Sequence, residues 1–244
     1  MTTSANGDTP EPKYYIVKRH LLGLIEAQAP GTVIPTERDL AAELDTSRTT
    51  VRQAVVELVA EGRLLRRQGS GTYVAEAKIT WPLDLASFTE QAAANGLVAS
   101  SELLDTQRIK AIDEVAERLA IKPGAWVYRL DRLRLADNWP VAVETSMLAA
   151  ERFPQLPRHM RKAESLHALL GEVYGIKLRR GEEMIDTAPA SPRDAKLLQT
   201  DAGAPMLVVK RLSFDSDGQP VEWGTSWFRG DRITLVARLT ARSR

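Results

Sequence analysis

In the first third of the chain, apolar residues recur at three- and four-residue intervals, which is the spacing of amphipathic helices. One helix is predicted over residues 14–27, and a second follows Thr36, whose hydroxyl can cap it. A third starts at Thr46 or Ser47, either of which can act as its cap, and closes at residues 61–62. Two packed helices joined by so short a turn predict a helix-turn-helix.

The segment after the third helix, residues 64–74, is predicted to form two strands around a Gly-Ser-Gly tip, which lets the backbone approach a groove closely. A helix-turn-helix followed by such a hairpin is a winged helix. The first turns of the third helix carry donors that suit DNA phosphates and base edges, namely Ser47, Arg48, Thr49, Thr50, Arg52 and Gln53. The alternative is an ordinary three-helix bundle with a hairpin, whose arginines are only solvated.

The rest of the chain mixes strand-like runs with short helices. Strands are predicted over residues 101–109, 126–135, 141–148, 178–187, 205–214, 220–228 and 233–239. Helices are predicted over residues 87–94, 113–120, 165–174 and 191–199. The turns Asp137-Asn138 and Asp217-Gly218 join consecutive strands as hairpins, so we expect a mostly antiparallel sheet with helices on it. The predicted fold class is α+β.

The length of 244 residues is typical of two domains. We expect a disordered tail over residues 1–12, a DNA-binding domain over 13–75, a linker over 76–82 and a second domain over 83–244. The net charge of the whole chain is only +1, but residues 46–75 hold five arginines against two glutamates. Positive charge is therefore concentrated in the predicted DNA-binding domain.

Several classes of site are disfavoured by composition. The chain has no cysteine, which excludes disulfides and thiolate sites, and its three scattered histidines (His20, His159 and His167) argue against a zinc site. No apolar run approaches the roughly 20 residues that span a membrane, and the start of the chain lacks the apolar core of a signal peptide. We therefore expect a cytoplasmic protein with no metal, no cofactor and no membrane partner.

Longer motifs carry a family resemblance over almost the whole chain. They are PTERDLAAEL, DTSRTTVRQAVVELVAEGRL and RRQGSGTYV in the first third, then RLRLADNWPVAVETS, DSDGQPVEWGTS and FRGDR. On these motifs the chain resembles GntR-superfamily transcription regulators of the HutC subfamily, which join a winged helix to a chorismate-lyase-like UTRA domain. Within the subfamily it is most similar to the regulators of N-acetylglucosamine utilisation, the NagR and DasR type, through KYYIVKRHLL and the SFTE segment.

The resemblance implies specific DNA contacts. The positions that match family residues touching operator phosphates and base edges are Arg38, Ser47, Arg48, Thr50, Arg52 and Gln53. Gln68 and Gly69 match the wing tip that enters the minor groove. Family members bind as homodimers, and two-fold-related heads imply a roughly palindromic operator of double-stranded DNA.

Two arginines in the second domain predict an anion site. Arg132 and Arg134 lie two residues apart on a strand, so both guanidinium groups project from one face about 7 Å apart and could clamp a phosphate monoester. The alternative is that they form salt bridges to Glu144 or other carboxylates. The segment Ser87, Phe88 and Thr89 lies at a helix start, where free N–H groups favour an anion, although plain capping would also explain it.

Carboxylates that match family positions would hold sugar hydroxyls or an amine. They are Glu144 and Glu222, and by alternation Glu222 and Phe228 share one face of a strand. A two-residue loop at 137–138 would place Glu144 opposite Asp131, away from Arg132, whereas a three-residue loop would pair it with Leu130 on the arginine face. The family prefers the second arrangement.

The chain departs from the N-acetylglucosamine regulators at two pocket positions, where His167 and Phe228 each replace a tyrosine. Each change removes a phenolic hydroxyl, which costs about 1 kcal/mol if nothing replaces it, although an imidazole can donate to a phosphate or titrate near neutrality. The resemblance predicts an allosteric repressor, not an enzyme, that senses glucosamine 6-phosphate or N-acetylglucosamine 6-phosphate. The alternatives are a different sugar phosphate, a carboxylate such as urocanate, a pure dimerisation domain, or an enzyme on the chorismate-lyase-like fold.

Overall fold

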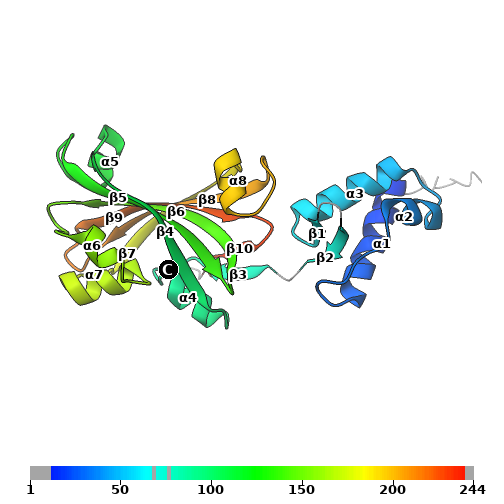
Figure 1. Cartoon of the computed structure of the whole chain (residues 1–244), viewed down its shortest axis with the longest axis horizontal. Coiled ribbons are helices and arrows are strands. Elements are labelled where there is room, and N and C mark those ends of the chain that lie inside the picture. Colours follow the sequence, from blue (N-terminus) through cyan, green and yellow to red (C-terminus); the bar gives the residue numbers. More distant parts are fainter. Residues whose placement is uncertain (1–11, 68–69, 76–77, 240–244) are drawn as a thin grey trace, which may run out of the picture. The chain divides into compact units, whose positions relative to one another are not determined.

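A computed structural model of the chain describes residues 12–67, 70–75 and 78–239. The chain divides into two compact units, residues 1–78 and 79–244, each with its own elements (Figure 1). The predicted tail lies outside the described residues except for Pro12, and so do residues 76–77 of the predicted linker and the wing-tip residues Gln68 and Gly69.

The first unit is the predicted winged helix. It contains α1 (Lys13–Ala27), α2 (Glu37–Glu43), α3 (Arg48–Ala60), β1 (Leu64–Arg67) and β2 (Gly71–Val74). The two strands pair antiparallel, and one apolar cluster joins all three helices to both strands. Thr36 caps α2 by accepting a hydrogen bond from the Asp39 amide, and Ser47, rather than Thr46, caps α3 by accepting one from the Thr50 amide.

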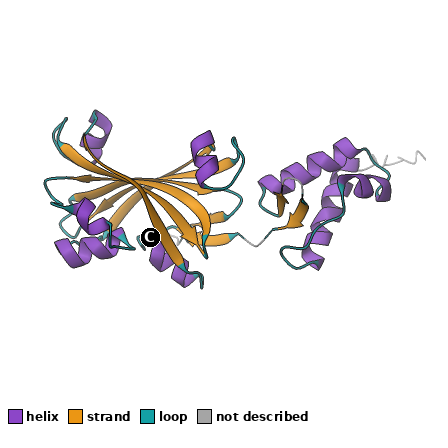
Figure 2. Ribbon diagram, viewed as in Figure 1, coloured by secondary structure: helices purple, strands orange, loops and turns teal. Residues whose placement is uncertain are grey.

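The second unit is built on a six-stranded sheet, in which each neighbouring pair of strands runs antiparallel. The strand order is β4-β5-β6-β9-β8-β7. The strands are β4 (Ala99–Lys110), β5 (Trp126–Ala136), β6 (Trp139–Ala149), β7 (Arg180–Pro189), β8 (Pro205–Phe214) and β9 (Pro220–Arg229). The prediction of an α+β fold with a mostly antiparallel sheet is confirmed (Figure 2).

Helices cover both faces of this sheet. On one side lie α4 (Phe88–Ala94), α6 (Leu156–Met160) and α7 (Leu166–Tyr174), and on the other lie α5 (Asp113–Arg118) and α8 (Pro192–Leu197) (Figure 1). Each side has its own apolar clusters, because alternate residues of a strand face opposite ways. The five-residue helix α6 was not predicted, since it is too short to show a helical period.

One expectation about the linker is wrong. Residues 79–82, which were expected to be linker, form strand β3 (Ile79–Pro82), and β3 pairs parallel with β10 (Ile233–Val236). The pairing ties Trp81 into an apolar cluster with Phe88 and Phe228, where it is 4% exposed. Burial of this aromatic ring explains why the segment is ordered as part of the second unit.

Candidate functional site

A pocket lies between the polar centre of the large sheet and the chain segments that cover it. Its floor comes from β5, β6, β7, β8 and β9, and its cover from β3, β10 and the first turns of α4 and α7. It holds about 730 Å³ of space that protein atoms do not fill, its mouth included. The lining contains all nine residues predicted to bind a ligand, namely Ser87, Phe88, Thr89, Arg132, Arg134, Glu144, His167, Glu222 and Phe228.

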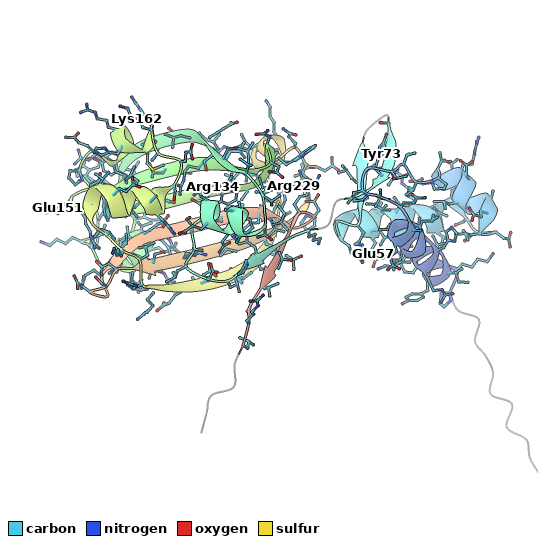
Figure 3. All side chains as sticks on the ribbon, turned by 90° about the horizontal axis from the view of Figure 1, so that it is seen from below. Glu57, Tyr73, Arg134, Glu151, Lys162 and Arg229 are labelled. Atoms are coloured by element: carbon cyan, nitrogen blue, oxygen red, sulfur yellow. The ribbon has the colours of Figure 1, made fainter. Side chains whose placement is uncertain are left out.

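The two predicted arginines are buried, and both bind the same carboxylate. Arg132 is 2% exposed and Arg134 is 5% exposed. Arg132 Nη2 donates to Glu144 Oε1, and Arg134 Nη2 donates to the same oxygen at 2.9 Å. The salt bridges to Glu144, which were the alternative to a free clamp, are therefore present. Arg134 lies in the interior of the unit beside α4, whereas Lys162 points outward at its periphery (Figure 3).

Glu144 pairs with a different residue of β5 than either of the two strand registers considered from the sequence would give. The loop has two residues, Asp137 and Asn138, both with positive φ, but β6 then holds an extra residue opposite the 134/135 step of β5. This bulge shifts the register by one, so Glu144 pairs with Arg132 and not with Asp131 or Leu130. Glu144 consequently lies on the face of the arginines, as the three-residue loop would have placed it, but the cause is the bulge and not the loop length.

The second carboxylate, Glu222, is held by a serine and a histidine. Its Oε1 accepts from Ser146 Oγ at 2.5 Å, and its Oε2 lies 3.4 Å from His167 Nε2. Ser146 Oγ also accepts from Arg132 Nη2 at 2.9 Å, so His167, Glu222, Ser146 and Arg132 form one connected chain. Ser146 was missed in the sequence, although it lies two residues after Glu144 and therefore on the same strand face.

Both carboxylates stay ionised near neutral pH. Burial alone would raise the pKa of Glu144, but the charges of Arg132 and Arg134 outweigh burial and lower it well below its usual range. Burial would likewise raise the pKa of Glu222, but the hydrogen bond from His167 helps to lower it. Burial and the charge of Arg134 lower the pKa of Arg132 to about 10, so this guanidinium also keeps its charge near neutrality.

Arg132 has donors left over after these contacts. Its Nε and Nη1 are buried and have no hydrogen-bond partner within the described part of the chain. An unsatisfied buried donor costs about 1–3 kcal/mol, and more when it is charged. Because Arg132 lines the pocket, a ligand with acceptor oxygens could satisfy these two donors.

The start of α4 forms the opposite wall. Ser87 Oγ accepts from the Glu90 amide, and the Ser87 amide donates to Glu90 Oε2 at 2.7 Å, which makes a complete capping box. The capping explanation of this segment is therefore correct: the amide and the side chain of Ser87 both hydrogen bond to Glu90 and lower the pKa of its carboxyl. Ser87 also lines the pocket, so its hydroxyl lies within reach of a ligand. Phe88 lies under Arg134 at 5.1 Å and beside Trp81, at a centroid distance of 5.0 Å.

Some pocket residues carried no clear signal in the sequence. Trp81 lay in the expected linker, and Ser165 was seen only as the start of a helix. Arg211 and Glu183, from the neighbouring strands β8 and β7, form an ion pair of 2.6 Å in the lining. Their pairing depends on the strand order of the sheet, which the sequence did not establish.

The residues predicted to contact DNA lie on the first unit and are mostly exposed. Arg48, Arg52 and Gln53 are exposed on α3, and within the described residues their side chains have no hydrogen-bond or ion-pair partner. Arg38 on α2 has 81% of its side chain exposed and only a 3.4 Å contact with Asp39. The Ser47 hydroxyl caps α3 and bonds to the Thr50 hydroxyl at 2.8 Å.

Within residues 12–67, 70–75 and 78–239, no group of histidine, aspartate and glutamate side chains has the arrangement of a metal site. In the same ranges, no helix is both long enough and apolar enough to cross a membrane.

Comparisons with known proteins match both units. The family described as "Bacterial regulatory proteins, gntR family" matches residues 16–74, and the UTRA domain matches residues 94–234. The HTH-type transcriptional repressor PhnF of Mycolicibacterium smegmatis is 37% identical over 231 residues, covering 95% of this chain and 94% of that protein. The HTH-type transcriptional repressor NagR of Bacillus subtilis is 32% identical over 234 residues, covering 95% and 96%.

A solved structure agrees with these matches. The crystal structure of PhnF from Mycobacterium smegmatis superposes with a TM-score of 0.66 at 36% identity, covering 93% of this chain and 100% of that one. The expected similarity to NagR is thus found, and the identity to PhnF is higher.

Proposed function

The chain belongs to the GntR family of bacterial regulatory proteins, in the HutC subfamily that carries a UTRA domain, and we propose that a phosphorylated amino sugar controls it. Its named relatives are transcriptional repressors, so we class it as a repressor of this type and not as an enzyme. In the proposal, the sugar phosphate binds in the pocket of the second unit and lowers the affinity of the first unit for operator DNA.

The observation that carries this proposal is the pair of unused donors on Arg132. A guanidinium that is 2% exposed, and whose Nε and Nη1 have no partner among the described residues, is suited to a ligand that brings strong acceptors. Phosphoryl oxygens are such acceptors, and their hydrogen bonds to arginine are charge-assisted. We assign the phosphate to Arg132 and Arg134, with the Ser87 hydroxyl and the Thr89 segment on the opposite wall.

The sugar part is assigned to the carboxylate side of the pocket. Glu144 and Glu222 offer acceptors to hydroxyls or to an amine, and His167 lies beside Glu222. Phe228 is 7% exposed and supplies an apolar surface for a ring face. The amine of glucosamine 6-phosphate would place a positive charge near two ionised carboxylates, which favours this ligand over a hexose phosphate without an amine.

The DNA side of the proposal rests on the exposed arginines of α3, Arg48 and Arg52, which have no partner among the described residues. We assign base-edge and phosphate contacts to exposed or partly exposed residues of the first unit, namely Arg38, Ser47, Arg48, Thr50, Arg52 and Gln53, and the wing-tip contact to Gln68 and Gly69. The repressor would bind as a homodimer to a roughly palindromic site. Trp81 lines the pocket and follows the last residue of the first unit by three positions, which makes β3 the candidate for transmitting occupancy.

The experiment measures operator affinity with and without candidate effectors. A duplex selected from random DNA by the protein would serve as a fluorescent probe in anisotropy titrations. We expect glucosamine 6-phosphate or N-acetylglucosamine 6-phosphate to weaken binding by about 5- to 150-fold, the usual range of allosteric coupling. Inorganic phosphate, fructose 6-phosphate and urocanate complete the panel.

Matched variants locate the effect. Arg132→Ala combined with Arg134→Ala should remove the effector response while DNA binding persists. Arg129→Ala is the control, because Arg129 lies on the same strand but pairs with Asp131 on the opposite face. If no sugar phosphate alters DNA affinity, or if the double variant responds like the parent protein, the assignment is wrong. A response to urocanate alone would favour a carboxylate sensor.

A further inference from the structure

The pocket contains a histidine–carboxylate pair, of which the binding scheme above uses only the carboxylate, as an acceptor for the sugar. His167 is the second residue of α7, and its side chain is 20% exposed. Its Nε2 lies 3.4 Å from Oε2 of Glu222, whose side chain is 8% exposed on β9. The pair is therefore set into the pocket wall and not on a freely solvated surface.

The pair is linked to the guanidinium that carries the unused donors. Glu222 accepts from Ser146, and Ser146 accepts from Arg132, whose Nε and Nη1 remain unpartnered within the described residues. A negative charge that binds at Arg132 consequently enters the same hydrogen-bonded group as His167. In a site of low polarity such charges interact more strongly than they would in water.

The permanent charges that line the pocket are balanced. Three guanidinium groups face three carboxylates, and each carboxylate has a positive or titratable partner. The pairs are Arg132 and Arg134 with Glu144, Arg211 with Glu183, and His167 with Glu222. A phosphate dianion would add two negative charges to this neutral set, and burying uncompensated charge is costly.

His167 is the lining group that can supply the missing positive charge. An imidazole is the side chain that gains a proton between about pH 5 and 8. The charged groups around it come from four elements, namely Glu222 of β9, Glu144 of β6, Arg132 and Arg134 of β5 and Glu90 of α4. A bound anion adds negative charge beside Arg132, and added negative charge near an imidazole favours its protonated form.

We propose that His167 takes up a proton when an anionic effector binds at Arg132, so that the repressor senses the effector more tightly as pH falls. This inference rests on the proposed function, because it requires a phosphorylated ligand in the pocket. His167 acts here as a residue that sets charge specificity, since its imidazolium balances the second negative charge of the phosphate. A neutral tyrosine at this position could not do so.

The test is calorimetry of N-acetylglucosamine 6-phosphate in buffers of different ionisation enthalpy, which counts the protons bound with the ligand. The parent protein should take up more protons than His167→Gln, by up to one. Between pH 8 and pH 6, the affinity of the parent protein for N-acetylglucosamine 6-phosphate should rise by as much as about tenfold per pH unit more than the affinity of His167→Gln does. The variant also corrects for titration of the phosphate itself.

His20→Gln is the matched control. His20 lies in the first unit at the same 3.4 Å distance from a carboxylate, that of Glu43, but it does not line the pocket. This variant should take up as many protons as the parent. His167→Tyr gives a second variant if glutamine impairs folding, and NMR of the three imidazoles, with His167 identified by its loss, reports the protonation directly.

The outcomes separate the two proposals. Binding with equal proton uptake in the parent and in His167→Gln, or an NMR signal of His167 that does not change with ligand, overturns the role of His167 alone. If none of the sugar phosphates binds the parent protein at any pH, the proposed function fails, and this inference fails with it.

Discussion

The arginines of the two units lie in opposite surroundings. Arg38 in the first unit has 81% of its side chain exposed, and Arg48 and Arg52 are exposed with no hydrogen-bond or ion-pair partner among the described residues, whereas Arg132 in the second unit is 2% exposed. An exposed guanidinium keeps its hydration, contributes little to folding and can exchange small ions for DNA phosphates. A buried one must be compensated within the protein.

This difference shows how each unit selects its partner. The first unit offers many independent charges, so its binding should be additive and sensitive to salt. In the pocket of the second unit the charged groups are already paired with one another, and Glu144 binds two arginines. A ligand can therefore bind only to the hydrogen-bonding groups that these pairs leave free. The donors without a partner among the described residues, such as Nε and Nη1 of Arg132, therefore indicate the type of ligand better than the number of charges in the pocket does.

The largest expected effect comes from removing the carboxylate that compensates the buried arginines. Glu144→Ala leaves Arg132 and Arg134 without their shared partner, and breaking a buried pair in this way costs about 3–5 kcal/mol of unfolding free energy. Urea unfolding followed by tryptophan fluorescence measures this loss in the second unit, because all five tryptophans lie there. Replacing an exposed charged residue should not lower the free energy of unfolding by a comparable amount.

Glu102→Ala is the control, since Glu102 is exposed on β4 and should change stability by less than about 0.5 kcal/mol. Equal losses in both variants would show that the buried network is not a source of stability. The pKa of Glu144 is lowered in the folded protein from an ordinary value of 4.5, so its contribution is present above that pH and is lost on acidification. The gap between the parent and Glu144→Gln should therefore narrow below pH 4.5.

Replacing an exposed arginine of α3 should instead affect DNA binding and leave stability nearly unchanged. Arg48→Ala should leave the stability of the first unit within about 0.5 kcal/mol of the parent and reduce the slope of log affinity against log salt by about one. Anisotropy titrations of the selected duplex at several salt concentrations measure that slope. Lys122→Ala, an exposed cation of the second unit, should leave the slope unchanged. An unchanged slope in Arg48→Ala would remove Arg48 from the DNA interface.

Regular elements with strong periodicity could be predicted from the sequence. The three helices of the first unit and the six long strands were found because their apolar spacing and turn residues agree. Strand β3 gives no strand signal in the sequence, because it is four residues long, ends in proline and pairs with β10 about 150 positions away. Such long-range pairing leaves no local pattern.

The candidate site shows the same limit at the level of single side chains. Alternation placed Arg132 and Arg134 on one face, and a predicted helix start pointed to residues 87–89. The family resemblance supplied Glu144, His167, Glu222 and Phe228. Glu144 lies opposite Arg132 because a bulge in β6 shifts it by one register position. Neither of the two loop lengths considered from the sequence predicted this pairing. A bulge depends on how two strands pack in the sheet, so it cannot be deduced from one strand alone.

The smallest expected effect tests whether Ser87 does more than cap its helix. Ser87 caps α4 and Ser191 caps α8, and each accepts a hydrogen bond from an amide three residues later, at 3.2 and 3.1 Å. Replacing either serine by alanine should cost about 1 kcal/mol of unfolding free energy. Only Ser87→Ala should also weaken binding of the sugar phosphate, by about fivefold, the value of one lost hydrogen bond of roughly 1 kcal/mol. Equal effector affinities in the two variants, measured by calorimetry, would leave Ser87 with capping as its whole role.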